Sequence, residues 1–319
     1  MTHPVWDRFL GEALPDDGAR DYAQRYAGYA LTGVTREEVF VFLRGPAGGG
    51  KSTFTEALAR TWGEYAVATP FAMFLAKKPA DGPREYLARL AGARLVTSVE
   101  TRDGQRLAEG PLKELTGGDT ITADRKHEHA FQFVPQCKLL LASNFRPGAN
   151  AADDGLWRRL RELPFPTARP RREDQDHSIK AALTDPAQAG PAILAWAVAG
   201  CARWLDQGLG EPAAVREATA DYRRSQAPLT DFVEECCRLG AGFGVQAGEL
   251  RAAYERHCAE NGVKHPLAAR AWGEALRALG CERVVYRTSQ GVRRMWGGIA
   301  LQRDGSDSGE REPGDESAS

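Results

Sequence analysis

The stretch RGPAGGGKST at residues 44–53 constrains this chain more than any other feature. From Gly45 to Ser52 it fits the pattern G-x-x-x-x-G-K-[ST], in which backbone N–H groups of a glycine-rich loop turn inward and cradle phosphate oxygens. The apolar run EVFVFLR precedes the loop, and STFTEALARTW, which has helical spacing, follows it. Strand, loop and helix in this order place phosphates at a helix N-terminus, where unpaired amides and the helix dipole favour anions.

The loop therefore predicts a site for ATP and Mg²⁺. Lys51 would reach the β and γ phosphates, and the Ser52 hydroxyl would hold the metal ion. A glycine-rich turn without a ligand is the competing interpretation, and the flanking strand and helix count against it. The residues predicted to contact the nucleotide are Gly45, Pro46, Ala47, Gly48, Gly49, Gly50, Lys51, Ser52 and Thr53.

Length and composition are those of an ordinary globular protein. The 319 residues, 42% of them hydrophobic, have room for two domains with substantial cores. No apolar run approaches the ~18 residues of a membrane span, and the first ten residues lack a signal-peptide pattern. We expect a cytoplasmic protein with no membrane partner.

The six cysteines are scattered without a C-x-x-C pair, so we expect reduced thiols, most of them in the core. His127, His129 and Cys137 match no zinc-binding spacing. The net charge of −1 is uneven, because residues 304–319 contain six acids and one arginine, a charge of −5, and the remainder carries +4. That acidic tail cannot bury apolar surface, so we expect it to be disordered. A mildly basic body is compatible with a nucleic-acid partner.

Alternating apolar runs and helical patterns indicate an α/β fold. EVFVFL, ARLVTSV and CKLLLAS are predicted strands of a P-loop sheet flanked by helices. We expect a helical collar at 1–33, an ATPase core at 34–170, a helical bridge or lid at 171–227 and a tail at 303–319. Three helical patterns followed by a basic hairpin, ERVVYRTSQGVRRMWGGIAL, predict a winged-helix-like domain at 228–302.

Two polar residues at predicted strand ends are candidates for ATP hydrolysis. Glu100 ends ARLVTSVE, where a carboxylate can orient the attacking water and help to hold Mg²⁺. Asn144 ends KLLLASN and could probe the γ phosphate. A surface glutamate and a turn asparagine are the alternatives.

Arg158 and Arg159 precede a predicted strand, LRELPF. A planar and always charged guanidinium suits a transferring phosphoryl group, and a neighbouring subunit often donates it. We expect at least one of the two arginines to be catalytic in trans; a surface ion pair is the alternative for the other.

In their order, these motifs resemble those of superfamily 3 helicases, specifically the helicase part of phage and plasmid primase-helicases related to the poxvirus primase-helicase. AQRYAGYALTG, the P-loop, SVET, LKELTGGDTITADR, KLLLASN and GLWRRLRELPF carry the resemblance, which extends over nearly all of residues 5–301. It implies an AAA+-like ATPase sheet and a homo-hexamer that moves 3′ to 5′ on single-stranded or forked DNA. It also implies a bacterial host cell and favours Arg159 as the finger.

The segment ADRKHEHAFQF departs from that group, which has an arginine in place of Asp124, and is closer to the papillomavirus replicative helicase. By that resemblance Lys126 and His127 contact DNA from a channel hairpin, and Arg125 supports them; a solvated surface hairpin is the alternative. In the C-terminal hairpin, Arg287, Arg293 and Arg294 with Tyr286 and Trp296 favour DNA slightly over a protein partner.

No primase residues precede the collar. Either these residues belong to a longer protein, or a separately encoded primase or polymerase is the partner. Two other functions stay open: an ATP-switched DNA-binding module, and a P-loop phosphotransferase such as a small-molecule kinase. A kinase needs no trans arginine and no DNA hairpin, so the segments DRKH and WRR count against it.

Overall fold

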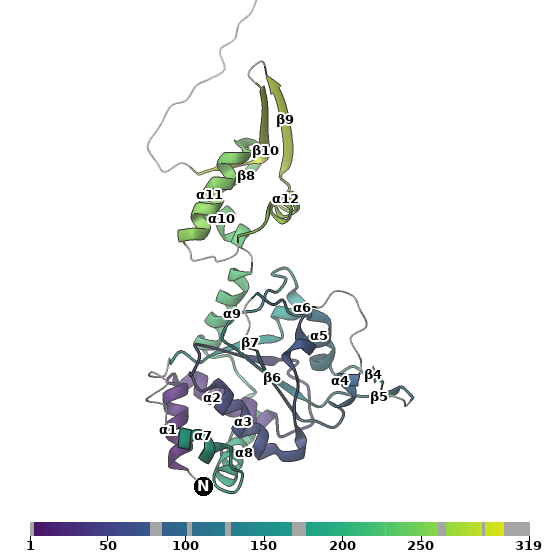
Figure 1. The fold of residues 1–319 in the computed structure, drawn as a ribbon, viewed down its shortest axis with the longest axis vertical. Coiled ribbons are helices and arrows are strands. Elements are labelled where there is room, and N and C mark those ends of the chain that lie inside the picture. Colours follow the sequence, from purple (N-terminus) through teal and green to yellow (C-terminus); the bar gives the residue numbers. More distant parts are fainter. Residues whose placement is uncertain are drawn as a thin grey trace, which may run out of the picture. The chain divides into compact units, whose positions relative to one another are not determined.

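The computed structural model describes residues 3–76, 85–100, 104–124, 129–167, 177–226, 228–260, 266–288 and 291–302. They form two compact units divided between residues 226 and 227 (Figure 1). Two hydrophobic clusters lie in the N-terminal unit and one in the C-terminal unit. The acidic tail predicted to be disordered lies outside the described residues.

Five parallel strands form the sheet of the N-terminal unit, in the order β2-β3-β6-β1-β7. The α/β class, with a sheet flanked by helices, is therefore confirmed. The strands are β1 (Phe40–Arg44), β2 (Ala66–Ala68), β3 (Leu95–Glu100), β6 (Lys138–Ser143) and β7 (Leu160–Pro164). The sequence predicts four of them; β2 has too few residues to show a period.

Helices cover both faces of the sheet because its strands are apolar on both sides. In β1, Phe40 and Phe42 enter one hydrophobic cluster while Val41 and Leu43 enter the other, as the alternation of side chains along a strand requires. The first face carries α4 (Glu85–Ala88), α5 (Glu109–Gly117), α6 (Asp154–Trp157) and the 3-10 helix η2 (Phe71–Phe74). The other carries α1 (Pro4–Ala13), α2 (Asp17–Tyr29), α3 (Lys51–Trp62), which continues into the 3-10 helix η1 (Gly63–Tyr65), α7 (His177–Thr184) and α8 (Gly190–Gln207) (Figure 1).

The helices expected to form a collar share their core with the rest of this unit. Helices α2 and α8 cross at Gly28 and Gly200, where the backbones touch. A Cβ on Gly200 would lie 2.0 Å from the carbonyl oxygen of Gln24, and one on Gly28 would lie 2.1 Å from the amide nitrogen of Cys201. Only glycine permits such an approach.

Helix α9 (Ala213–Ser225) covers the β7 edge of the sheet. It places Val215 in one hydrophobic cluster and Tyr222 in the other. The outward amide of Glu162 in β7 donates to the hydroxyl oxygen of Thr219 at 2.9 Å. The edge strand therefore has a partner other than a further strand.

A short antiparallel pair, β4 (Ile121–Ala123) and β5 (Phe131–Phe133), flanks the predicted DNA hairpin, and its last register pair is Ala123 with Phe131. Arg125, Lys126 and His127 lie outside the described residues.

The C-terminal unit is a three-stranded antiparallel sheet packed on three helices, with strand order β8-β10-β9. Its elements are α10 (Pro228–Cys236), β8 (Cys237–Gln246), α11 (Ala247–Glu260), α12 (Ala269–Ala278), β9 (Glu282–Thr288) and β10 (Gly291–Leu301). The expected helices and hairpin are present. Strand β8 was not expected, because the glycines of CRLGAGFGVQ weaken the signal for a strand.

One residue assigned to a nucleic-acid surface is a core residue. Trp296 is 4% exposed and belongs to the hydrophobic cluster of the C-terminal unit, so that interpretation is wrong. Arg293 and Arg294 are exposed and, as neighbours in a strand, point to opposite faces of β10. The side chains of Tyr286 and Arg287 lie outside the described part.

All six cysteines are free thiols, and Cys137, Cys237, Cys258 and Cys281 are buried. Among the described residues, no helix combines the length and hydropathy that crossing a membrane requires. In that same part of the chain, no three His, Cys, Asp or Glu side chains group as metal ligands; His127 is not in it.

The α2–α8 crossing predicts a large cost for a small substitution. Gly200→Ala should lower the free energy of unfolding by about 1–3 kcal/mol, because the added methyl group meets backbone that cannot move aside. Gly11→Ala is the matched control: Gly11 is an exposed position of α1 with open space around it, and the same change there should stabilise by ~0.5–1 kcal/mol. Urea unfolding of both variants measures the difference, and equal effects would contradict the close approach.

Candidate nucleotide-binding site

The parallel strands bring the predicted ATP-binding residues to one end of the sheet, where the strands finish. Strand register pairs Ser143 with Arg44 on one side and with Glu100 on the other. The glycine loop, Glu100 and Asn144 therefore all lie at the carboxyl ends of adjacent strands, which is where open α/β sheets bind ligands.

Tight packing fixes the loop backbone. Gly48 and Gly50 have φ values of +78° and +93°, a region that side chains disfavour. A Cβ on Gly45 would lie 2.0 Å from the carbonyl oxygen of Phe165, and one on Gly50 would lie 3.0 Å from the ring of Phe9 in α1. The glycines of the motif thus serve close packing as well as access to the backbone.

Lys51, the first residue of α3, is buried and binds three oxygens. Its Nζ donates to the carbonyl oxygens of Gly45 at 2.6 Å and Pro46 at 2.8 Å, and to Oδ1 of Asn144 at 2.9 Å. Burial, helped by the nearby charge of Arg44, lowers the pKa of Lys51 from its ordinary 10.5 to about 8. The contact with Asn144 joins segments 93 residues apart.

The two candidate metal ligands differ in what the structure describes. Ser52 is exposed in the first turn of α3, where its hydroxyl is the oxygen ligand that Mg²⁺ prefers. Glu100 is the last residue of β3, and its side chain lies outside the described part. Both fit the predicted metal position by chemistry and by place in the fold.

Arg158 and Arg159 lie at the opposite end of the sheet, where β1 and β7 begin. The amide of Phe40, the first residue of β1, donates to the carbonyl oxygen of Arg159 at 2.9 Å, so β1 separates the arginines from the loop by roughly 17 Å of strand. Nη2 of Arg159 donates to Oε2 of Glu38 at 2.9 Å, and Nη1 donates to the carbonyl oxygen of Gly155 at 2.9 Å. The Arg159 side chain is 9% exposed and that of Arg158 is 66% exposed.

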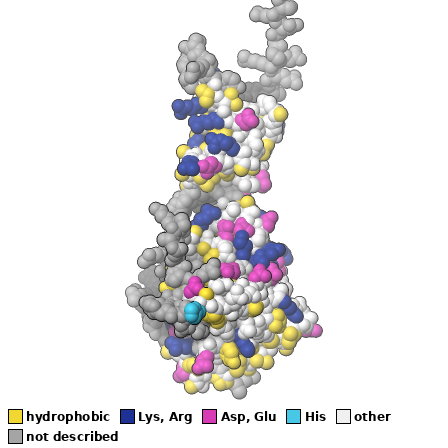
Figure 2. Space-filling model, turned by 90° about the vertical axis from the view of Figure 1, so that its right-hand side faces the viewer, with side chains coloured by type: hydrophobic (Ala, Val, Ile, Leu, Met, Phe, Trp, Pro, Cys, Tyr) yellow, Lys and Arg dark blue, Asp and Glu magenta, His cyan; other side chains and the backbone are white. Residues whose placement is uncertain are grey.

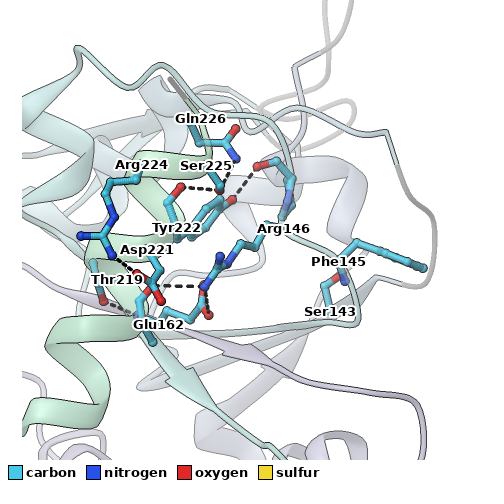
Figure 3. Close-up of polar contacts among 12 residues, drawn as sticks. Ser143, Phe145, Arg146, Glu162, Thr219, Asp221, Tyr222, Arg224, Ser225 and Gln226 are labelled. Carbon is cyan, nitrogen blue, oxygen red and sulfur yellow. Dashed lines mark hydrogen bonds and ion pairs between the residues drawn. The ribbon is translucent and has the colours of Figure 1, made fainter. Parts of the chain in front are cut away.

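A polar cluster that the sequence did not reveal follows Asn144 (Figure 3). Arg146 forms a two-pronged ion pair with Glu162, with Nε and Nη2 each 2.8 Å from a carboxylate oxygen. Tyr222 of α9 donates its hydroxyl hydrogen to the carbonyl oxygen of Pro147 at 2.6 Å. These partners lie far apart along the chain, so no local pattern could have predicted them.

A second pair supports the same region. Lys113 in the motif LKELTGGD donates to Asp153 at 2.6 Å, and Asp153 accepts from the amide of Leu156 at the start of α6. The hydrogen bond from Lys113 holds the pKa of Asp153 at about 2, below its ordinary 3.8. Lys113 thus anchors the segment before the two arginines.

A family model with the description "Family of unknown function (DUF5906)" matches residues 43–159. The matched span begins in β1 and ends at Arg159, so it contains the candidate site and both arginines.

Three proteins of similar sequence come from viruses. A "Putative helicase" of Acanthamoeba polyphaga mimivirus is 28% identical over 242 residues, which cover 70% of this chain and 25% of the relative. A "Putative helicase" of Frog virus 3 is 25% identical over 286 residues, 85% of this chain and 29% of the relative. A "Putative primase" of African swine fever virus is 25% identical over 162 residues, 49% of this chain. The chain spans about a quarter of the length of the first two relatives.

Among solved structures, an apo form of the C-terminal region of NrS-1 aligns with a TM-score of 0.54 at 12% identity, covering 92% of this chain and 75% of the other. A second apo structure of that region gives a TM-score of 0.53 and covers 94% of this chain. This likeness shows a shared fold. The resemblance expected from the motifs is therefore confirmed: the chain has distant homology to viral proteins whose names include helicase or primase.

Proposed function

We propose that this chain is the motor part of an ATP-driven replicative DNA helicase of a phage, prophage or plasmid-like element. The observation that carries the proposal is the contact between Lys51 and Asn144, two predicted phosphate-sensing groups that meet beside the glycine loop. The proposed assembly is a homo-hexamer that moves 3′ to 5′ on single-stranded or forked DNA in the cytoplasm of a bacterial host cell. A separate primase or polymerase is the proposed partner.

We assign each group a role at the nucleotide. Phosphate oxygens of ATP would replace the loop carbonyls as partners of the Lys51 ammonium, and Asn144 would contact the γ phosphate. Ser52 would hold Mg²⁺, and Glu100 would orient the attacking water and help to hold the ion. The metal supplies charge neutralisation at the phosphates.

Arginine from a second subunit would complete the site. Neither Arg158 nor Arg159 can reach the nucleotide of its own chain, because β1 lies between them and the loop. We propose Arg159 as the finger, since Gly155 holds its guanidinium in place and its outer nitrogen pairs with the carboxylate of Glu38, whose side chain is 45% exposed. A neighbour's γ phosphate would take the place of Glu38.

Two surfaces are proposed to contact DNA. The first is the hairpin between β4 and β5, with Arg125, Lys126 and His127. The second is the C-terminal unit, whose order of helix, strand, two helices and hairpin supports a winged-helix interpretation. Figure 2 shows Lys and Arg side chains gathered over this unit, which has exposed Arg283, Arg293 and Arg294 on its hairpin strands.

The same unit supports a second candidate function. A separate C-terminal unit with exposed arginines is also what an ATP-switched DNA-binding module needs. Such a module would bind DNA in one nucleotide state without separating strands.

Nucleotide binding should take up protons at alkaline pH. With a pKa of about 8, the Lys51 amine is roughly three-quarters neutral at pH 8.5, and a bound triphosphate raises the pKa again. We expect an uptake of more than about half a proton per site, measured by titration calorimetry in buffers of different ionisation enthalpy. Lys51→Arg, which stays charged, should bind ATP without uptake. Equal uptake by both proteins would contradict the placement of Lys51.

ATP hydrolysis and strand separation test the function. Lys51→Ala should lower the DNA-stimulated ATPase rate by about a hundredfold or more, and Glu100→Gln should bind ATP but barely hydrolyse it.

Replacing Lys126 and His127 together with alanine should leave basal ATPase near normal while unwinding of a 3′-tailed fork collapses. If the unsubstituted protein hydrolyses ATP but separates no strands under any nucleotide or salt condition, the switched binding module is the better description.

Mixed assemblies test the shared site. Arg159→Ala and Lys51→Ala proteins should each be inactive, and mixing them should restore part of the ATPase, because some interfaces then combine an intact loop with an intact finger. Transition-state stabilisation by such an arginine is worth ~10³-fold or more. Arg158→Ala is the matched control and should keep most activity alone. Absence of recovery in mixtures shown to contain both proteins would rule out Arg159 as a finger in trans.

A further inference from the structure

Three of the seven residues that follow Asn144 are bound through backbone atoms to α9 or to the residue after it. The hydroxyl of Tyr222 donates to the carbonyl oxygen of Pro147 at 2.6 Å. The side-chain oxygen of Gln226, just after α9, accepts from the amide of Ala149 at 2.8 Å. Nε of Arg223 donates to the carbonyl oxygen of Ala151 at 3.0 Å. Each contact engages main-chain atoms, so it fixes the path of the segment rather than one side chain.

The start of this segment is held most firmly. Arg146 forms a bidentate ion pair with Glu162 in β7, and the Glu162 side chain is 1% exposed. Nη2 of Arg146 also donates to the carbonyl oxygen of Ala218 in α9 at 3.2 Å. Its guanidinium lies 5.4 Å from the centre of the Tyr222 ring. A charged pair buried to this extent keeps its geometry, since separating it would leave a carboxylate without compensation.

Asn144 therefore lies between two fixed points. On one side β6 is paired with strands on both of its edges, and it ends at fully buried Ser143. On the other side Arg146 is anchored to β7 and α9. Between them, the amide of Phe145 donates to the hydroxyl oxygen of Ser143 at 3.1 Å and closes a tight turn. The reach of the Asn144 side chain toward Lys51 is set by these anchors.

We infer that α9 positions Asn144 for catalysis, with Tyr222 and the Arg146–Glu162 pair as positioning residues that act through the turn at residues 143–146. The inference rests on the proposed ATPase. It assigns to α9 a task beyond covering the sheet: the helix holds the side chain that contacts the γ phosphate at the distance the reaction needs. Loosening an anchor should reduce the rate of hydrolysis and leave the binding of ATP, which depends on the loop and Lys51, nearly unchanged.

Tyr222→Phe is the sharpest test, because it removes one hydrogen bond and keeps the ring packed against Phe42 and Trp157. Replacing Arg146 or Glu162 risks the fold itself. Tyr26→Phe is the matched control: the Tyr26 hydroxyl is also buried and donates at 2.7 Å to a carbonyl oxygen, that of Leu139 in β6, but does not touch the turn. The two variants should lose similar thermal stability.

With single-stranded DNA and saturating ATP, we expect Tyr222→Phe to lower kcat about tenfold with little change in the Kd for a non-hydrolysable ATP analogue. Tyr26→Phe should keep the kcat of the unsubstituted protein. In an Asn144→Ala background, Tyr222→Phe should have no further effect on kcat, because the residue through which it acts is gone.

The outcomes separate the inference from the proposed function. If Tyr222→Phe and Tyr26→Phe change kcat equally, or if Tyr222→Phe lowers kcat as much in the Asn144→Ala background as alone, α9 has only a structural role and the inference fails. Those results leave a Lys51-dependent ATPase standing. A protein without any Lys51-dependent hydrolysis would overturn both the inference and the proposed function.

Discussion

The burial of β1 on both faces governs the architecture of the N-terminal unit. Phe40 and Phe42 point to one layer while Val41 and Leu43 point to the other, and all four are fully or almost fully buried. A strand of this kind is stable only in the middle of a sheet that helices cover on both sides. Polar side chains of such a strand are confined to its ends, and the parallel direction collects the carboxyl ends of the strands at one end of the sheet. The meeting of Lys51 with Asn144 follows from that confinement.

Features that depend on a local pattern could be predicted from the sequence. The strands β1, β3, β6 and β7 show as apolar runs, and the glycine spacing before Lys51 identifies the phosphate loop. Strand β2 has three residues and β8 is interrupted by glycines, so neither has a readable period. Trp296 was misassigned because a small unit needs large aromatic side chains for its core, and sequence alone does not tell which face of a strand is buried.

The parts of the site that the sequence did not reveal are long-range. Arg146, Glu162 and Tyr222 each look like ordinary polar or aromatic residues in their own segments. Their roles appear only when β7 and α9 lie beside the turn after β6 (Figure 3). The close contacts of the glycines are also long-range. The motif predicts a glycine at position 50, but it does not predict that the ring of Phe9, about forty residues earlier, leaves little room for a side chain there.

Neither edge of the five-stranded sheet offers a long run of free backbone to a further strand. At one edge β2 offers only three residues, and at the other Thr219 occupies the outward amide of Glu162. The described residues therefore give copies of this chain little backbone through which to extend the sheet from one molecule into the next. An assembly of subunits that does not extend this sheet has to form through side-chain surfaces. Interfaces of that kind can slide and rotate without breaking backbone ladders, and that freedom is what a machine whose subunits change position in turn would require.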